Sequence, residues 1–298
     1  MIVSRLKNEL ILTSVVFLIN THIDMKGKNP IGVFDSGYGG LTILSEIRRL
    51  MPEYDYLYLG DNARAPYGNR SFDVVYEYTL EAVKTLFDQG CHLVILACNT
   101  ASAKALRSIQ QQDLPTLAPS KRVLGVIRPS AEEIGRQTHS KHVGILATEG
   151  TVQSKSYILE LQKFAPEIIV NQHACPLWVP LIENNKQDSA AGKQIISDDL
   201  NALLLKDPEI DAIVLGCTHY PLVQSYIESL VPSHINIISQ GKIVADKLKI
   251  YLLSHPEIEG KCSKNGGIKY LTTENAEIFN ANAARFLGID IQSESIHF

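Results

Sequence analysis

The sequence predicts an α/β fold of two similar doubly wound parallel-sheet domains, related by pseudo-two-fold symmetry. The first observation behind this is a pattern that occurs twice: an apolar run, one small residue, a cysteine and polar residues, at residues 93–100 and 212–219. The second is that strand patterns alternate with helix patterns along the chain. Each apolar run is typical of a buried parallel strand, and ligands bind at the carboxyl ends of such strands. We therefore expect Cys98 and Cys217 to lie at a crevice.

A second internal repeat supports two related halves. Residues 31–36 and 143–148 each form a strand pattern that is followed by a hydroxyl residue and a glycine-containing turn. In the first half this strand precedes the cysteine strand by 66 residues, from Gly32 to Cys98, and in the second half by 73 residues. Chance similarity of apolar strands could explain either repeat alone. The matching order and spacing favour two βαβ-type halves.

Between these strands the periodicity predicts the remaining elements in order. Ser71 is a suitable N-cap and Gly90 a stop for one long helix, and we expect the proline-containing residues 115–119 to break the chain. The loop at residues 60–70 separates a strand from that helix. Helices are predicted at residues 41–50, 71–89, 100–112, 130–137, 157–164, 188–205, 223–230, 242–253 and 277–287, and further strands at residues 54–59, 123–127, 168–171, 235–238 and 268–272.

The expected division of the chain follows from this order. The C-terminal segment contains no third cysteine strand, so we assign it back to the first domain. We expect an extension at residues 1–28, a first α/β domain at residues 29–122 that is completed by residues 237–298, and a second α/β domain at residues 123–236.

The composition is that of an ordinary globular enzyme. The 298 residues suffice for two domains with a core each, and 45% hydrophobic and 20% charged residues are typical values. A net charge of −4 offers no basic surface for nucleic acid. The five cysteines are odd in number and widely spaced, which argues against a disulfide framework and favours the cytoplasm. Because there is no C-x-x-C or H-x-x-x-H pair, we expect no metal.

The N-terminal segment has two interpretations. Residues 10–19 form an apolar run behind Arg5 and Lys7, which resembles a signal peptide. The run is too short to span a membrane, and residues 20–24 offer no small-residue cleavage site. We therefore expect no membrane association, and we interpret the segment as the result of a start codon assigned too early, with Met25 as the true start.

Two thiols that face each other across a crevice have a definite chemical use. One can remove a proton from one face of a carbon atom while the other returns a proton to the opposite face, as a two-base racemase requires. A free thiol has a pKa of about 8.5, so only a small fraction is ionised at pH 7. The reaction, however, needs one ionised and one protonated thiol in each direction. An acid near one thiol and a histidine near the other would set these states. This chemistry needs no cofactor, and no lysine stands in a recognisable pyridoxal phosphate motif.

Two further segments have a functional and a structural interpretation. Residues 35–41 run from a strand through glycines into a helix, and they would expose backbone N–H groups to an anion. They are not a G-x-G-x-x-G motif, and a tight turn capped by Asp35 explains them equally well. The loop at residues 60–68 has little reason to carry Tyr67 unless something packs on it, although a surface loop is the simpler explanation.

Six segments, taken together, carry a resemblance to a known family. They are Asp35-Ser36-Gly37 with Gly39-Gly40, Pro66-Tyr67-Gly68, residues 97–101, residues 216–221, Ala147-Thr148 with Thr151, and Cys175-Pro176 followed by Glu183. In order and spacing they resemble the glutamate racemase family. The resemblance covers about residues 31–287, nearly the whole chain, and the paired cysteine motifs are highly specific. Residues 239–241, Ser-Gln-Gly, depart from the Asp-containing segment that the family pattern has there.

The resemblance implies a cofactor-independent isomerase that interconverts L- and D-glutamate in the crevice between the domains and supplies D-glutamate for peptidoglycan. It implies that Cys98 takes the α-proton of D-glutamate and that Cys217 takes that of L-glutamate. Asp35 would lie beside Cys98, and His219 beside Cys217, with Glu183 as a further acid near the second thiol. The partner expected is glutamate, with a homodimer left open. The substrate-binding residues that the resemblance implies are Asp35, Ser36, Pro66, Tyr67, Gly68, Asn99, Thr100, Thr148, Thr151, Thr218 and His219.

Three alternatives remain open. Another racemase of the same superfamily would act on aspartate or a hydantoin, although residues 66–68 and 217–221 favour the glutamate branch. A non-catalytic amino-acid-binding or regulatory protein would not need two thiols. A thiol hydrolase would use a Cys-His pair and an acyl substrate, which leaves Cys98 without a purpose.

Overall fold

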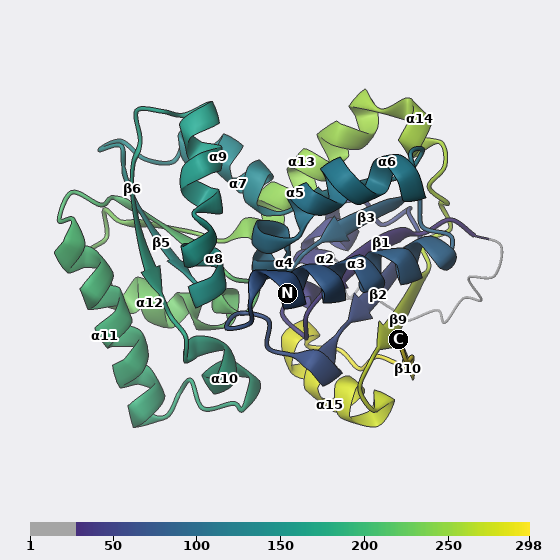
Figure 1. Ribbon diagram of the computed structural model, residues 1–298. Coiled ribbons are helices and arrows are strands. Elements are labelled where there is room, and N and C mark those ends of the chain that lie inside the picture. Colours follow the sequence, from purple (N-terminus) through teal and green to yellow (C-terminus); the bar gives the residue numbers. More distant parts are fainter. Residues whose placement is uncertain (1–27) are drawn as a thin grey trace, which may run out of the picture.

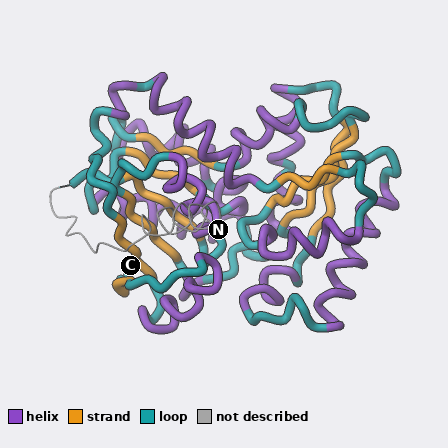
Figure 2. The backbone as a smooth tube through the Cα atoms, turned by 180° about the vertical axis from the view of Figure 1, so that it is seen from behind, coloured by secondary structure: helices purple, strands orange, loops and turns teal. Residues whose placement is uncertain are grey.

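Two separate parallel sheets organise the molecule. The computed structural model describes residues 28–298, so the apolar run at residues 10–19 and the proposed start at Met25 lie outside the described residues. One sheet has six strands in the order β10-β9-β2-β1-β3-β4, and the other has four in the order β6-β5-β7-β8. The two sets of strands lie in different halves of the molecule, on the right and left of Figure 1, and are well apart in the view from behind (Figure 2). The predicted α/β class with two parallel-sheet domains is confirmed.

The central strands β1 and β7 are buried along their whole length, because helices cover both faces of each sheet. In β1, Phe34 pairs with Leu59 on one side and with Leu96 on the other, and all three are buried. The strands are β1 (Ile31–Asp35), β2 (Tyr56–Gly60), β3 (Leu93–Leu96), β4 (Arg122–Gly125), β5 (His142–Ala147), β6 (Ile169–Ala174), β7 (Ala212–Gly216), β8 (Asn236–Ile238), β9 (Ile268–Thr272) and β10 (Ser293–Ser295).

The helices follow the strands and return the chain for the next one. The predicted N-cap of α3 is observed, since the Ser71 hydroxyl accepts the N–H of Val74 at 3.3 Å. The helices are α2 (Gly40–Leu50), α3 (Phe72–Asp88), α4 (Asn99–Lys104), α5 (Leu106–Ser108), α6 (Leu114–Leu117), α7 (Ile127–Ile134), α8 (Glu149–Ser154), α9 (Ser156–Phe164), α10 (Trp178–Glu183), α11 (Ala190–Lys206), α12 (Gln224–Leu230), α13 (Gln240–Ser254), α14 (Pro256–Glu259) and α15 (Ala276–Leu287), with a π-helical turn at Ile109–Asp113 and 3₁₀ turns at Asn62–Arg64 and Tyr220–Val223.

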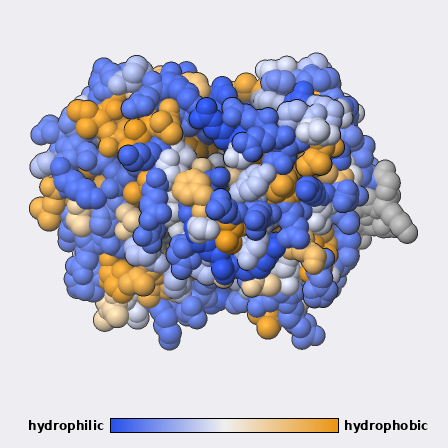
Figure 3. Space-filling model, viewed as in Figure 1, coloured by the Kyte–Doolittle hydropathy of each residue, from blue (hydrophilic) through white to orange (hydrophobic). Residues whose placement is uncertain are grey.

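Each sheet has a hydrophobic core on both faces. Alternate residues of β1 divide between two clusters, with Val33 in one and Phe34 in the other, as the two-residue period of a strand requires. In the smaller sheet Ile213 and Val214 of β7 divide in the same way. The visible outer surface is mainly hydrophilic with small scattered apolar areas (Figure 3). In the part of the chain that the structure describes, no helix is both long enough and apolar enough to cross a membrane.

The C-terminal segment returns to the larger sheet. Strand β9 pairs with β2 from Ile268 to Thr272, β10 pairs with β9, and helix α13 packs on α2. Strand β4 belongs to the larger sheet and β8 to the smaller one. The expected boundaries at 122/123 and 236/237 cut through these two strands. The crossings between the sheets therefore come a few residues later in the chain than expected.

Some local predictions were wrong. The helical run that was predicted to end at residue 112 extends to Leu117, because Pro115 lies in the first turn of α6, where no backbone N–H is needed. The run then ends inside residues 115–119, where the break was expected. Strand β4 ends at Gly125 and α7 begins at Ile127, three residues before the predicted start. The short helices α8 and α10 were not predicted, and both lie next to the site described below.

Candidate active site

A cavity of about 330 Å³ lies between the two halves, at the carboxyl ends of β3 and β7. Both cysteines of the repeated pattern line it, as the strand rule predicts. Twelve of the fourteen predicted site residues line this cavity: Ser36, Pro66, Tyr67, Gly68, Cys98, Asn99, Thr100, Thr148, Glu183, Cys217, Thr218 and His219.

The other two predicted residues, Asp35 and Thr151, lie behind the wall of the cavity. Asp35 is fully buried, accepts the N–H of Gly37 at 2.9 Å and lies 3.4 Å from the hydroxyl of Thr218. The hydroxyl of Thr151 lies 3.0 Å from that of Thr148, which itself lines the cavity. Both residues therefore support threonines that face the cavity.

The first thiol is buried, and uncharged groups lie within hydrogen-bond distance of it. Cys98 is 5% exposed, and its Sγ lies 3.4 Å from the Ser36 hydroxyl and accepts the N–H of Ala101 at 3.4 Å. Burial raises the pKa of Cys98 to about 12, and the charge of Asp35 adds to the effect, while Ser36 and Ala101 oppose it. Burial also raises the pKa of Asp35, although the charge of His219 opposes this.

The second thiol is held beside a cation. The Sγ of Cys217 lies 3.9 Å from Nδ1 of His219, and Nε2 of His219 lies 2.9 Å from a carboxylate oxygen of Glu183. Burial alone would lower the pKa of His219, but its hydrogen bonds to Cys217 and Glu183 and the charges of these groups outweigh burial and raise it to about 10. These contacts favour the protonated, positively charged form of the imidazole beside the thiol.

The glycine-rich turn joins the two thiol regions. The carboxylate of Asp35 caps this turn, as the structural interpretation of residues 35–41 predicts. A Cβ atom on Gly39 would overlap with side-chain atoms of Thr218 and His219 from the other half. The hydroxyl of Thr42 donates to the backbone carbonyl of Thr218 at 3.0 Å. Glycine is needed here because the turn of one half touches the loop that carries the second thiol.

The loop that carries Tyr67 belongs to the site and not to the surface. Tyr67 is 1% exposed, and its hydroxyl donates to the buried carboxylate of Asp61. Asp61 also accepts from Arg64 Nε at 2.7 Å and from the hydroxyl of Thr273 at 2.8 Å. The ring of Tyr67 is thereby fixed at the cavity wall, and the simpler interpretation of a surface loop is wrong.

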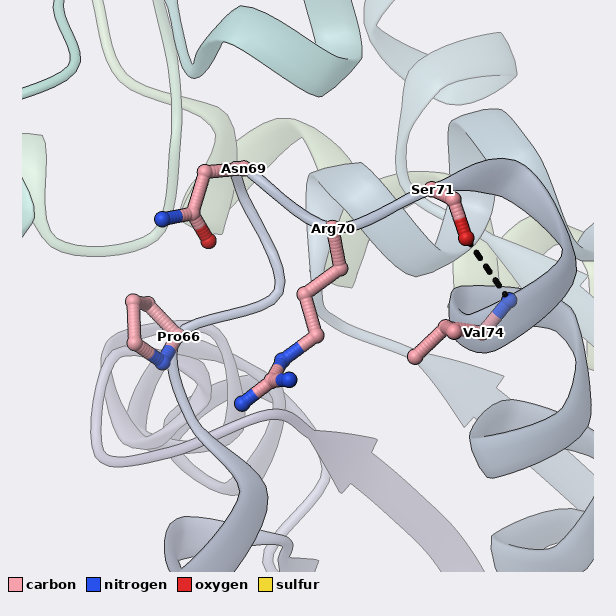
Figure 4. A pocket seen from close by; sticks show the side chains of 5 residues that line it. All are labelled: Pro66, Asn69, Arg70, Ser71 and Val74. Carbon is pink, nitrogen blue, oxygen red and sulfur yellow. Dashed lines mark hydrogen bonds between the residues drawn. The ribbon is translucent and has the colours of Figure 1, made fainter.

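A second hollow, of about 360 Å³, adjoins the cavity at Pro66 and Asn69. Arg70, Ser71 and Val74 complete its lining, and Figure 4 shows the side chain of Arg70 extending toward Pro66. Neither thiol lines it, so the crevice between the halves is the candidate active site.

One cluster of the described residues has the ligand types of a metal site. The side-chain ligand atoms of His173, Cys175 and Asp199 lie within 4.8 Å of one another. However, one oxygen of Asp199 lies 2.9 Å from Nε2 of His173, and the other accepts Trp178 Nε1 at 2.7 Å. Because protein donors engage both carboxylate oxygens, hydrogen bonding that anchors the start of α10 accounts for the cluster.

The sequence did not identify the apolar wall of the cavity. Cys175 and Pro176 carried part of the family resemblance but were not predicted as site residues, although they follow directly after β6, where the rule on strand ends places a site. No sequence signal indicated the apolar residues Ala65, Leu177, Val179 and Pro180 or the polar lining residues Asn69 and Glu149, which lie on loops or on short helices.

The fold and the site together define a class: a two-domain parallel α/β protein with one buried thiol from each half at a shared cavity. Residues 41–248 match the family model Asp/Glu/Hydantoin racemase. The chain belongs to this family.

Several relatives are similar over nearly their whole length. A glutamate racemase from Ruegeria sp. (strain TM1040) is 40% identical over 275 residues, which cover 89% of this chain and 99% of the relative. The crystal structure of a glutamate racemase isoform from Bacillus anthracis has a TM-score of 0.82 at 35% identity and covers 90% of this chain and 97% of its own. The glutamate racemase from Francisella tularensis subsp. tularensis SCHU S4, solved with D-glutamate, has a TM-score of 0.80 at 29% identity, with 91% and 98% covered.

Proposed function

We propose that this chain is a glutamate racemase that interconverts L- and D-glutamate by proton transfer through Cys98 and Cys217. The observation that carries the proposal is that these buried thiols, one from each half, line one cavity. The similarity to glutamate racemases over nearly the whole chain supports glutamate as the substrate.

The proposed reaction needs one proton acceptor and one proton donor. With D-glutamate, the Cys98 thiolate takes the α-proton and becomes a thiol, and the electron pair of the broken C–H bond delocalises into the α-carboxylate. The Cys217 thiol then gives its proton to the opposite face, which yields L-glutamate and a Cys217 thiolate. The reverse reaction exchanges the two roles.

The neighbours of each thiol support these roles differently. The Ser36 hydroxyl and the Ala101 N–H can hydrogen-bond the Cys98 thiolate, whose pKa is otherwise raised by burial. A proton on Asp35 would remove the charge that raises this pKa further. The protonated His219 stabilises the Cys217 thiolate by charge.

The polar lining supports binding of the zwitterionic substrate. The hydroxyls of Thr100 and Thr148 lie 2.9 Å apart, one from each half, and Asn99 and Thr218 each follow a catalytic cysteine. Such hydroxyl, amide and N–H groups can hold carboxylates and stabilise the charge that develops on the α-carboxylate. We propose that Ser36, Tyr67, Gly68 and Pro66 complete this wall.

We also propose that the D-glutamate serves peptidoglycan synthesis in the cytoplasm. A second copy of the chain is the one macromolecular partner proposed. Sedimentation velocity across protein concentrations would test the homodimer, since a single monomer-sized species at every concentration would contradict it.

The activity is tested by circular dichroism of purified protein with each glutamate enantiomer and no added cofactor. We expect the signal of either enantiomer to decay to zero, and aspartate, assayed in parallel, to change far more slowly. In heavy water the product should carry deuterium at the α-carbon much earlier than the unconverted substrate does. Equal rapid labelling of both would indicate a single shared base and would contradict the two-thiol mechanism.

A further inference from the structure

A closed ring of hydrogen bonds is buried next to the first thiol. Nδ2 of Asn99 donates to the side-chain oxygen of Gln240 at 2.7 Å, and Nε2 of Gln240 donates to the Tyr157 hydroxyl at 2.8 Å. The Tyr157 hydroxyl donates to Oδ1 of Asn99 at 2.9 Å and closes the ring. All three side chains are at most 2% exposed. Each ring member both donates and accepts, so the loss of one side chain removes two of the three hydrogen bonds of the ring.

The ring lies where the chain crosses between the two halves. The chain crosses from the larger to the smaller sheet between β4 and β5, and it returns after β8 through α13. Gln240 begins α13, and its amide also contacts the hydroxyl of Ser130 at 2.8 Å and the carbonyl of Val126 at 3.3 Å in the first crossing. Figure 1 shows α7 and α13 side by side at this junction. One glutamine therefore ties both crossings to Asn99.

Asn99 connects this junction to the chemistry. It is the first residue of α4 and directly follows Cys98, whose Sγ accepts the N–H of Ala101 in the first turn of the same helix. The position of the thiol therefore depends on the position of this turn. The Asn99 side chain, held by Tyr157 from the smaller half and by Gln240, fixes the turn from behind.

We propose that Gln240 and Tyr157 are positioning residues, which hold Asn99 and through it align Cys98 for proton transfer. The inference rests on the proposed racemase function. Glutamine suits position 240 because its amide accepts from Asn99 and donates to Tyr157, whereas an ionised glutamate could only accept and a leucine could do neither. The segment at residues 239–241 departs from the family pattern, and the contacts of Gln240 show that this departure reaches the site.

The test is Tyr157→Phe, which removes a single oxygen from the ring. Because the two enantiomers have equal free energy, kcat/KM must fall by the same factor in both directions, so rates alone do not show which transfer has slowed. Primary isotope effects do, since Cys98 removes the label from α-deuterated D-glutamate and Cys217 removes it from the L-isomer. We expect kcat/KM to fall about 10-fold or more, the isotope effect with D-glutamate to rise, and that with L-glutamate to fall.

A second variant and a control keep the test decisive. Gln240→Leu should show the same pattern, and the double variant should be no slower than the slower single variant, because both act through one ring. Tyr56→Phe is the control: it removes an equally buried hydroxyl, which donates to the Met51 carbonyl at 2.7 Å at the amino-terminal end of β2. We expect wild-type isotope effects in this control.

Three results would overturn the inference. The first is isotope effects that stay unchanged or that change alike for both enantiomers. The second is a loss of kcat/KM in the double variant that equals the product of the two single losses. The third is loss of folded protein in both single variants, which would mean that the ring serves stability alone. An inactive wild-type protein would instead refute the proposed function, so the two failures can be told apart.

Discussion

The two thiol regions are alike in backbone and different in their neighbours. Cys98 and Cys217 each follow a fully buried central strand, β3 or β7, and are exposed to nearly the same extent, 5% and 6%. Cys98, however, lies near a buried acid and accepts hydrogen bonds from neutral groups. Cys217 lies beside the imidazole of His219, which Glu183 supports from the other side.

This difference in neighbours separates the placement of the thiols from the control of their protonation. The repeated strand-and-cysteine pattern delivers a thiol to each side of the cavity, which is a matter of geometry. The neighbours set the protonation states, which is a matter of charge. A racemase needs equivalent positions but opposite charge states at each moment, so a repeated fold with unlike neighbours meets both needs.

The largest expected effect comes from removing either thiol. Cys98→Ala and Cys217→Ala should each lower racemisation by at least about 10³-fold, because each face of the α-carbon needs its own acid or base. Turnover of both enantiomers, with circular dichroism to check the fold, would measure this. Cys91→Ala is the matched control, since Cys91 is a buried thiol that does not line the cavity. Near wild-type turnover of either site variant would refute the two-thiol assignment.

A smaller loss is expected from Gly39→Ala. The added Cβ would overlap with Thr218 and His219 and push the second thiol's loop away from the turn. We expect a fall of about 10²-fold in kcat/KM, with a larger isotope effect for α-deuterated L-glutamate, on which Cys217 acts. Gly260→Ala, whose Cβ would lie 3.2 Å from the Pro256 carbonyl, serves as control. A larger isotope effect on the D-isomer would show that the turn serves the first thiol.

Glu183→Gln tests the charge on the second side. The carboxylate of Glu183 helps to raise the pKa of His219 to about 10, so its loss should lower that pKa. We expect about a 10-fold loss of kcat near neutral pH, and an alkaline limb of the pH profile that moves to lower pH. An unchanged alkaline limb would mean that His219 does not set the charge state of Cys217.

The last prediction concerns stability and not rate. The folded pKa of His219, about 10, lies above the unfolded value near 6.5, so its stabilising contribution is fully present below about pH 6.5 and is lost as pH rises toward 10. Wild-type protein should lose up to about 1.4 kcal/mol of unfolding free energy per pH unit in this window relative to His219→Gln. Urea unfolding of both proteins at several pH values would measure the difference. Parallel curves would contradict the raised pKa.

Much of the fold and most of the site could be predicted, because their signals are local. The apolar run before Cys98 marks a buried strand, and the polar residues after it mark the strand's functional end. The helix start at Ser71 was found for the same reason, since the cap and the first turn are neighbours in sequence. The helical run ends at Leu117, inside the break expected at residues 115–119, but it passes its predicted end at residue 112 because Pro115 fits the start of a helical turn as well as it fits a break.

The parts that were missed depend on contacts between distant residues. Asn99 and Gln240 are 141 positions apart, and nothing near either of them in the sequence announces the hydrogen bond between them. The apolar wall at Val179 and Pro180 lies on a helix of six residues, too short to give a periodic pattern. The contact of Gly39 with Thr218 likewise depends on how the halves are packed.

If the proposed two-thiol mechanism holds, the near-complete burial of both thiols makes the protonation state of the protein depend on its last turnover. In the proposed mechanism, conversion of a D-isomer leaves a proton on Cys98 and removes one from Cys217, which is the state that would accept the L-isomer. To take a second D-isomer, a proton must leave one thiol and another must reach its partner. The thiols line the cavity but are only 5% and 6% exposed, so this exchange of protons with water is a step separate from proton transfer to the substrate. Product and substrate thus meet different forms of the same protein.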